Sequence, residues 1–338
     1  MSRPTKSASS YAAAGVDIDA SDRAVDALVG VLKGIEVPSR TVDLPGHYAS
    51  VLRLTDELGV AFATDGVGSK LVVAEETGRV ETVGIDCVAM NVNDIVCVGA
   101  EPIALVDYIA VEQADPDQLA AIGRGLAVGA QSAGVEIPGG EVAVLPELIR
   151  GHPSPHGFDL CASCIGTVRL DEIVTGKEVA PGDAMIGLPS SGLHSNGYTL
   201  ARRALSSLSY DDAPPELGGQ TVADVLLEPT LIYVRAVLDL LRSDIPVHGL
   251  AHITGGGTDN LLRLRDDVAY RVEDALPVPP VFGLVQRLGE VGDDEMRRVF
   301  NMGCGFVCVV PDDAADAATE LLAAHHPGTR RIGTVAER

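Results

Sequence analysis

The sequence predicts a two-domain α/β protein, and three observations support that fold class. The chain has 338 residues, 46% of them hydrophobic, whereas single hydrophobic cores stop growing at roughly 250–300 residues. In both halves, apolar runs of strand length alternate with segments of helical periodicity. Between the halves, the polar stretch 171–183 contains Gly and Pro and is typical of a domain junction. We therefore expect one domain over residues 1–170 and a second over residues 171–338.

The first half is expected to begin with a helix. Residues 21–33 place apolar side chains on one face, with Ser21 as the N-cap and Gly34 as the stop. A later helix is expected to start at Asp115-Pro116, which is a favourable cap and first turn, and to end near Ala133. The other elements predicted here are strands at 60–64, 102–110, 135–137 and 158–168 and a helix at 83–98.

The second half repeats this alternation of strands and helices. Its expected strands are 184–188 and 305–310, and its expected helices are 198–205 and 229–241. Residues 210–219 contain two prolines and two glycines and are expected to form a surface connection.

The composition argues against partners that carry dense negative charge. The formal charge of −23 and the sequence pI near 4.6 would repel nucleic acid and anionic membranes. A phosphate-bearing ligand therefore needs a local exception. No stretch approaches the ~18 apolar residues of a membrane span, and residues 1–10 lack the apolar centre of a signal peptide. We expect a cytoplasmic protein.

The charge pattern also predicts adaptation to high salt. The acid excess is spread along the chain, only four of the 25 basic residues are lysines, and tryptophan is absent. This pattern is typical of halophilic proteins such as those of halophilic archaea, because the Debye length is only ~3 Å at molar salt and self-repulsion is largely screened. We expect the melting temperature to rise between low and molar KCl.

The six cysteines are predicted to be buried thiols. The closest pairs, Cys161 with Cys164 and Cys304 with Cys308, lie on expected strands. On a strand, residues three apart face opposite sides, and residues four apart stand ~13 Å from each other. Neither spacing can chelate one zinc ion, whereas buried thiols behave as small apolar groups.

The most informative motif is Thr64-Asp65-Gly66-Val67-Gly68-Ser69-Lys70, which follows an apolar run. Its glycines let backbone N–H groups approach an anion, Asp65 can bind a divalent cation, and Lys70 can neutralise phosphate oxygens. The order Ser-Lys excludes a Walker A loop, which needs Gly-Lys followed by Ser or Thr. An ordinary glycine turn after a strand is the alternative interpretation.

The expected helix 83–98 carries a narrow polar stripe. Asp86 and Asn93 lie within ~20° of each other around the helix, and Asp94 lies ~80° further round. A half-exposed helix facing water would explain the stripe. However, no lysine or arginine accompanies these acids, so burial of the acids would require a cation.

Three further segments combine glycine or serine with polar groups. Gly139-Gly140-Glu141 allows close backbone approach beside a carboxylate, although a plain glycine turn explains it equally well. Residues 190–198 open a helix whose free N–H groups attract an anion, and a merely capped helix is the alternative. Residues 252–259 place three glycines ahead of a helix and form a second candidate anion site.

The order of these segments resembles that of the AIR synthetase family, the phosphoribosylformylglycinamidine cyclo-ligases of purine biosynthesis. The resemblance covers nearly the whole chain. Its most specific motifs are Gly-Val-Asp-Ile-Asp near the start and His-Ser-Asn-Gly-Tyr in the middle. The matching segments are 15–20, 65–70, 84–86 with 90–94, 99–102, 139–141, 194–198, 254–257 and 300–303.

The resemblance implies an ATP-dependent ring closure at a site to which both domains contribute. The amide oxygen of formylglycinamidine ribonucleotide is activated by phosphoryl transfer from Mg-ATP, a nitrogen attacks the activated carbon, and phosphate leaves as 5-aminoimidazole ribonucleotide forms. The implied cofactors are ATP and Mg²⁺, with K⁺ as a further candidate cation. The family fold also implies a homodimer joined through the first-domain sheets, with ATP held near that interface.

The resemblance also assigns roles to residues of this chain. Asp65, Asp94 and Glu141 are implied to hold Mg²⁺, with support from Asn93. ATP contacts are implied for Asp65, Gly66, Gly68, Ser69, Lys70, Asn93, Gly139 and Gly140. Substrate contacts are implied for Ser191, Gly192, His194, Ser195, Asn196, Thr254, Gly255 and Gly256. The implied catalytic residues are Lys70, Asp94 and His194, with His194 as the proton-transfer group or, alternatively, a structural histidine.

Two departures from the family pattern stand out, and other functions remain as alternatives. Val142 replaces the usual Thr after Gly-Gly-Glu, and residues 44–48 replace a glycine-rich stretch with Phe, which leaves that loop without a role. Formylglycinamidine ribonucleotide synthase needs an ammonia source and usually has extra domains. Selenophosphate synthetase usually has a reactive cysteine near its start, and none occurs here before Cys87. Thiamine-phosphate kinase is a more distant option, and a non-catalytic nucleotide-binding module would predict loss of the carboxylates.

Overall fold

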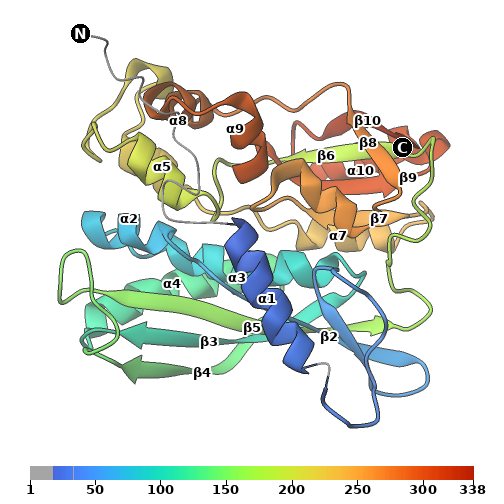
Figure 1. The fold of residues 1–338 in the computed structure, drawn as a ribbon, viewed down its shortest axis with the longest axis horizontal. Helices are drawn as coiled ribbons and strands as arrows, with labels where there is room; N and C mark the ends of the chain where they lie inside the picture. Colours follow the sequence, from blue (N-terminus) through green and yellow to red (C-terminus); the bar gives the residue numbers. More distant parts are fainter. Residues whose placement is uncertain (1–17, 33) are drawn as a thin grey trace.

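The computed structural model describes residues 18–32 and 34–338, and it confirms the two-domain α/β fold (Figure 1). Each domain contains a five-stranded sheet, ordered β1-β2-β5-β3-β4 in the first and β7-β9-β6-β10-β8 in the second. Residues 15–17 of the family motif at 15–20 lie outside the described residues. Among the described helices, none is long and apolar enough to cross a bilayer.

The first sheet is covered on one face by two helices. Its strands are β1 (Ser50–Arg53), β2 (Leu58–Gly66), β3 (Glu101–Val111), β4 (Glu136–Val144) and β5 (Phe158–Arg169). The covering helices are α3 (Thr82–Val96) and α4 (Pro116–Ala133). Buried and exposed residues alternate along β5, as expected of a strand with one face on the core. Asp115 caps α4 by accepting hydrogen bonds from the N–H groups of Asp117 and Gln118.

The other face of the first sheet is exposed and apolar. Phe62, Val106 and Tyr108, which point to this face, each keep at least 40% of their surface exposed. Strand β5 lies between β2 and β3, and its partly buried Ile165, in register with Phe62, connects these side chains across the outer face. Contiguous apolar patches of this kind mark interaction surfaces in proteins.

The second domain has its own core. Its strands are β6 (Ala184–Pro189), β7 (Gly249–His252), β8 (Val268–Val272), β9 (Cys304–Val310) and β10 (Arg330–Glu337). Its helices are α5 (Tyr198–Ala204), α6 (Val222–Leu227), α7 (Val234–Leu241), α8 (Pro280–Gly289), α9 (Asp293–Val299) and α10 (Ala315–His325), with 3₁₀ turns at Pro215–Leu217, Gly257–Arg263 and Asp312–Ala314. Every residue of β9 is buried, so this strand runs through the middle of the domain.

Helix α3 lies between the two domains. It packs against β2 and β5 of its own sheet and also contacts α7 and β7 of the second domain (Figure 1). Twelve of its residues are buried, including Asp86 and Asn93. The polar stripe therefore faces the second domain, and the interpretation of a half-exposed helix facing water is wrong.

Several element boundaries differ from the sequence predictions. Helix α1 (Ile18–Leu32) begins before Ser21, so Ser21 is not its cap, and the apolar Val25, Leu28 and Leu32 are exposed in the described part of the chain. The helix expected at 229–241 begins only at Val234. Its first turns do not form because side chains of α3 accept the backbone N–H groups of residues 230 and 233.

Other elements were not predicted at all. Helix α2 (Lys70–Thr77) starts at the last residue of the motif 64–70, where no helix was expected. Strands β1, β7, β8 and β10 and helices α6, α8, α9 and α10 also lacked a prediction. The prediction of buried thiols is confirmed for five of the six cysteines, all of which are free, whereas Cys161 is only partly buried.

Candidate active site between the two domains

Asp65 is fixed at the end of β2. Its backbone N–H donates to Asn91 Oδ1 at 3.0 Å, and Asn91 Nδ2 donates back to the Asp65 carbonyl at 3.1 Å. The Asp65 carboxylate accepts a hydrogen bond from the N–H of Gly66 at 2.7 Å. Burial and the neighbouring Asp94 carboxylate raise the pKa of Asp65. Two carboxylates thus lie close together in a poorly solvated position, which suits a hard divalent cation.

Asp94 connects the first domain to a histidine of the second. Its Oδ1 atom lies 2.9 Å from Nδ1 of His252, the last residue of β7. The His252 side chain is fully buried, whereas that of Asp94 is 19% exposed. Within the described residues, Asp94 Oδ2 has no hydrogen-bond donor. The histidine therefore holds one oxygen of the carboxylate and leaves the other for a ligand.

Glu141 does not join these two acids within one chain. The strand order places β4 three strands away from β2, a separation of ~14 Å. Asp65 pairs through Ala162 and Asp107 with Gly140, so Glu141 belongs to the next row and points to the opposite, outer face. Among residues 18–32 and 34–338, no three acidic, histidine or cysteine side chains gather around one metal position. Asp65, Asp94 and Glu141 therefore do not share one site within a single chain, and the metal-binding role of Glu141 stays a prediction.

Gly139 and Gly140 lie on the same edge strand, apart from the interdomain residues. A Cβ atom on Gly140 would come within 2.4 Å of the Asp107 carboxylate. Glycine is therefore needed here for close packing against β3.

Lys70 is buried at the start of α2 rather than presented to a ligand. Its ammonium lies 2.7 Å from Asp86 Oδ2, 2.7 Å from the Glu228 carbonyl and 3.2 Å from the His194 carbonyl. An ammonium has three N–H donors; two of them have backbone acceptors here, and the third contact is the ion pair with Asp86. Burial lowers the pKa of Lys70, and the Asp86 carboxylate opposes that effect. In this arrangement Lys70 does not face a phosphate, contrary to the expected role.

The two buried residues of the polar stripe bind the backbone of the second domain. Asp86 Oδ1 accepts hydrogen bonds from the N–H and the hydroxyl of Thr230 at 2.8 and 2.6 Å. Asn93 accepts from the N–H of Tyr233 and donates to the Leu231 carbonyl, both at 2.9 Å. The Asn93 amide is thus engaged in the domain interface and not directed at a metal.

His194 occupies a strained and buried position. Its φ of 62° is unusual for a residue other than glycine, and its side chain is almost fully buried. Its Nε2 atom accepts a hydrogen bond from the N–H of Ser191 at 3.3 Å, and its Nδ1 atom is buried without a partner. Burial, followed by the charges of His252 and Lys70, keeps the pKa of His194 well below its usual range. The imidazole is therefore neutral, with its proton on Nδ1.

The remaining expected substrate residues belong to two adjacent loops. The Asn196 amide stands 3.4 Å from the position that a Cβ would take on Gly255, and its Oδ1 is buried without a partner. The Ser191 hydroxyl donates a hydrogen bond to the carbonyl of residue 229, and the Ser195 hydroxyl shares one with the hydroxyl of residue 230. The Gly192 carbonyl accepts a hydrogen bond from the Asn301 amide. In the other loop, the N–H of Thr254 donates to Asn260, and Gly256 has a φ of 107°.

The glycine-containing motif 64–70 of the first domain contacts the same region. Gly68 adopts a positive φ of 73° ahead of α2, and the Ser69 hydroxyl lies 3.1 Å from the Thr199 hydroxyl of α5. Gly66 ends β2 beside Asp65. Asp65 to Ser69, the His194 loop and the glycine-rich 254–257 loop therefore border one interdomain region.

Sequence reasoning missed three residues of this region. His252 was noted only as the start of a glycine-rich segment, although it binds Asp94. Tyr48 donates from its hydroxyl to the Asn260 carbonyl at 3.1 Å, and Arg263 stacks on the Tyr48 ring. The departure from the family pattern at 44–48 was the only signal that pointed to Tyr48.

Comparisons with known proteins agree with this architecture. Residues 46–168 match the family described as AIR synthase related protein, N-terminal domain, and residues 180–338 match the corresponding C-terminal domain. The chain is 50% identical over 333 residues to a phosphoribosylformylglycinamidine cyclo-ligase of Methanothermobacter thermautotrophicus, covering 97% of this chain and 94% of the relative. It is 46% identical over 326 residues to the cyclo-ligase of Thermococcus kodakarensis, covering 93% and 92%.

Solved structures share the fold at lower identity. The HypE-HypF complex includes a chain with a TM-score of 0.65 and 20% identity, which covers 93% of both chains. A ThiL structure with AMPPCP and TMP has a TM-score of 0.64 and 14% identity, and it covers 93% of this chain and 90% of the other.

Proposed function

This chain belongs to the AIR synthase related family, and on that premise we propose how its interdomain site works. The activity is that of a cyclo-ligase of purine biosynthesis: formylglycinamidine ribonucleotide and ATP give 5-aminoimidazole ribonucleotide, ADP and phosphate. The observation that carries the assignment to this site is the pairing of Asp65 and Asp94 beside two second-domain loops. The first domain then holds the nucleotide, and the second presents the amide.

We propose that Asp65 and Asp94 hold Mg²⁺. Carboxylate oxygens are the ligands that this ion prefers, and the raised pKa of Asp65 indicates that its negative charge lacks compensation. When bound there, Mg²⁺ would neutralise charge on the phosphoryl group during its transfer. The N–H groups of Gly66, Gly68 and Ser69 border the same region and would contact ATP phosphates. K⁺ is a further candidate cation, and no residues are assigned to it.

The His194 side chain is proposed to act as a hydrogen-bond donor. Because Nε2 accepts the N–H of Ser191 and burial keeps the ring neutral, only Nδ1–H is available to a ligand. A donor aimed at the amide oxygen would stabilise negative charge that develops as the ring closes. Ser195, Asn196 and the 254–256 loop would position the ribonucleotide around it.

A homodimer is proposed to form through the outer face of the first sheet. That face is apolar and exposed, and Glu141 points toward it from the edge strand. In such a dimer, Gly139, Gly140 and Glu141 would lie at the interface, where the family fold places ATP. A solution mass of two chains is the expected result.

The decisive assay supplies the purified chain with formylglycinamidine ribonucleotide, ATP and MgCl₂ at high KCl. We expect ADP, phosphate and 5-aminoimidazole ribonucleotide in equal amounts. As a control, formylglycinamide ribonucleotide with ammonia replaces the substrate and tests the related synthase reaction. Turnover only in the control, or none by folded protein, would refute the assignment.

A further inference from the structure

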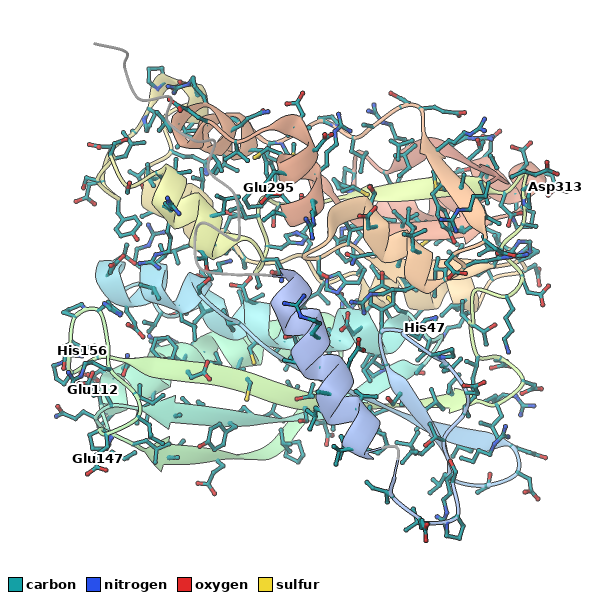
Figure 2. All side chains as sticks on the ribbon, in the orientation of Figure 1. His47, Glu112, Glu147, His156, Glu295 and Asp313 are labelled. Carbon is teal, nitrogen blue, oxygen red and sulfur yellow. The ribbon has the colours of Figure 1, made fainter. Side chains whose placement is uncertain are left out.

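We propose that His47, Tyr48 and Arg263 form a phosphate-binding site where the two domains meet, next to Asp65 and Asp94. The loop that carries His47 and Tyr48 belongs to the first domain, and Arg263 ends the 3₁₀ turn Gly257–Arg263 of the second. Figure 2 shows His47 at the junction between the domains. The inference rests on the proposed function only for the identity of the phosphate compound.

Tyr48 provides a fixed support for the guanidinium. The centre of the Arg263 guanidinium lies 4.9 Å from the centroid of the Tyr48 ring. Tyr48 is only 8% exposed, and its hydroxyl donates to the Asn260 carbonyl. Such cation–π stacking holds the planar guanidinium in a defined orientation. Its N–H groups remain free to bind a ligand.

Two neighbouring groups donate hydrogen bonds and lack acceptors. The Arg263 side chain is exposed, and none of the described residues accepts a hydrogen bond from it or forms an ion pair with it. His47 Nδ1 accepts the N–H of Tyr48 at 3.0 Å, so the proton of the neutral ring is on Nε2. That Nε2 atom is buried and has no partner. A guanidinium and a buried N–H without acceptors are the donors that an anion requires.

The position beside Asp65 and Asp94 favours an anion that binds together with a metal ion. The Arg263 charge lowers the pKa of Asp65 and of His47, although burial is the largest effect on both. Despite this electrostatic proximity, Arg263 forms no ion pair within 4.0 Å of either acid among the described residues. A phosphate oxygen between a cation on the acids and the guanidinium would satisfy both sides. Arginine binds phosphate in a bidentate geometry that matches this role.

The site also adjoins the glycine-rich loop. Asn260, which accepts the Tyr48 hydroxyl, donates from its amide to the Gly255 carbonyl and accepts the N–H of Thr254. A phosphate here could therefore belong to ATP, held from the side of the acids, or to the ribonucleotide, held from the side of this loop. The shared chemistry is a phosphate group, and the experiment distinguishes its two sources.

The first experiment uses inorganic phosphate as the probe and needs no turnover. Wild-type protein, Arg263→Met and Arg271→Met are titrated with phosphate by calorimetry at constant high KCl, with and without MgCl₂. Arg271 is a matched control because it is exposed on β8, at the sheet edge opposite β7. We expect Arg263→Met to weaken phosphate binding about tenfold or more, and Arg271→Met to leave it unchanged. Equal affinity in wild type and Arg263→Met would overturn the site.

A second pair of variants tests the histidine donor. His47→Asn retains a group that can accept the N–H of Tyr48 but removes the Nε2–H donor, whereas His47→Gln can place a donor near the Nε2 position. Phosphate affinity is expected to fall about threefold to tenfold in His47→Asn and to recover in His47→Gln. Equal losses in both variants would remove His47 from the site.

Steady-state kinetics then identify the source of the phosphate. A higher KM for ATP in Arg263→Met identifies the nucleotide, and a higher KM for formylglycinamidine ribonucleotide identifies the substrate phosphate. Weakened phosphate binding with neither KM changed would overturn a role in the reaction. If wild-type protein shows no cyclo-ligase turnover, the proposed function fails, while the phosphate titrations still decide whether the site exists.

Discussion

Helix α3 carries two acids, Asp86 and Asp94, whose surroundings differ sharply. Asp86 is fully buried, pairs with Lys70 and accepts two hydrogen bonds from Thr230. Asp94 is partly exposed, has one oxygen held by His252, and lies near Asp65, whose pKa is raised. The charges of the first cluster pair with each other inside the protein, whereas the second is the cluster for which we propose a bound cation.

The difference indicates that the Lys70–Asp86 cluster stabilises the domain interface, whereas the Asp65–Asp94 cluster is the candidate for ligand binding. A buried charge persists only when it is paired and hydrogen-bonded, and Lys70 fulfils that need for Asp86. The cation expected to accompany the acids of α3 is thus an ammonium at one end of the helix. The proposed metal site lies at the other end, where, among the described residues, one carboxylate oxygen of Asp94 and the nearby donors of Arg263 and His47 have no partners.

The largest effect is expected from a substitution that breaks the Lys70–Asp86 ion pair. Lys70→Met leaves Asp86 buried without its cation and should lower the free energy of unfolding by about 3–5 kcal/mol. Chemical denaturation at constant KCl measures the loss. The double variant Lys70→Met with Asp86→Leu should recover part of it, because removal of both charges eliminates the unpaired one. A single variant as stable as wild type would contradict the structural role of Lys70.

In the Asp65–Asp94 cluster, a substitution should reduce activity strongly and stability only slightly. Asp94→Asn removes a charge that is proposed to bind Mg²⁺ and should reduce kcat at least ~100-fold. The free energy of unfolding should change little, since the amide can still accept from His252. Turnover and denaturation of the same preparation provide the comparison. Unchanged kinetics would remove Asp94 from the site, and a large loss of stability would assign it to the architecture.

A smaller effect is expected from the pH dependence of the apo protein. The folded-state pKa of Asp65 is raised above its ordinary value of 3.8, so the stability that this carboxyl contributes is present below that value. It is lost as the pH rises through the raised pKa. In EDTA, the melting temperature of wild type relative to Asp65→Asn should therefore fall between acidic and neutral pH.

Addition of MgCl₂ at neutral pH should raise the melting temperature of wild type more than that of Asp65→Asn, because a bound ion stabilises the folded state. Equal responses of the two proteins to pH and to MgCl₂ would show that Asp65 ionises without hindrance and without metal.

The sequence predicted the members of both clusters but not their partners. Helical periodicity placed Asp86, Asn93 and Asp94 on one stripe, because side chains seven to eight residues apart are separated by about two helical turns. The partners of that stripe come from distant positions: His252 is separated from Asp94 by 158 residues and Thr230 from Asp86 by 144. No local pattern encodes such contacts, so Lys70 was expected to bind phosphate. The separation of Glu141 from these acids could not be predicted for a similar reason, since the sequence of a strand does not specify its position in the order of the sheet.

The smallest effect is expected at Ser69, where the motif 64–70 contacts the second domain. Its hydroxyl contacts only the Thr199 hydroxyl at 3.1 Å among the described residues, and a hydrogen bond between neutral groups contributes about 0.5–1.5 kcal/mol. Ser69→Ala keeps the backbone N–H proposed to contact ATP, so its KM for ATP should rise less than about threefold and its stability should fall by at most ~1 kcal/mol. Gly68→Ala is the contrasting variant, because the positive φ at Gly68 disfavours any side chain and a shift there would move the N–H groups themselves. A Ser69→Ala enzyme impaired as strongly as Gly68→Ala would mean that the hydroxyl, and not the backbone, binds the nucleotide.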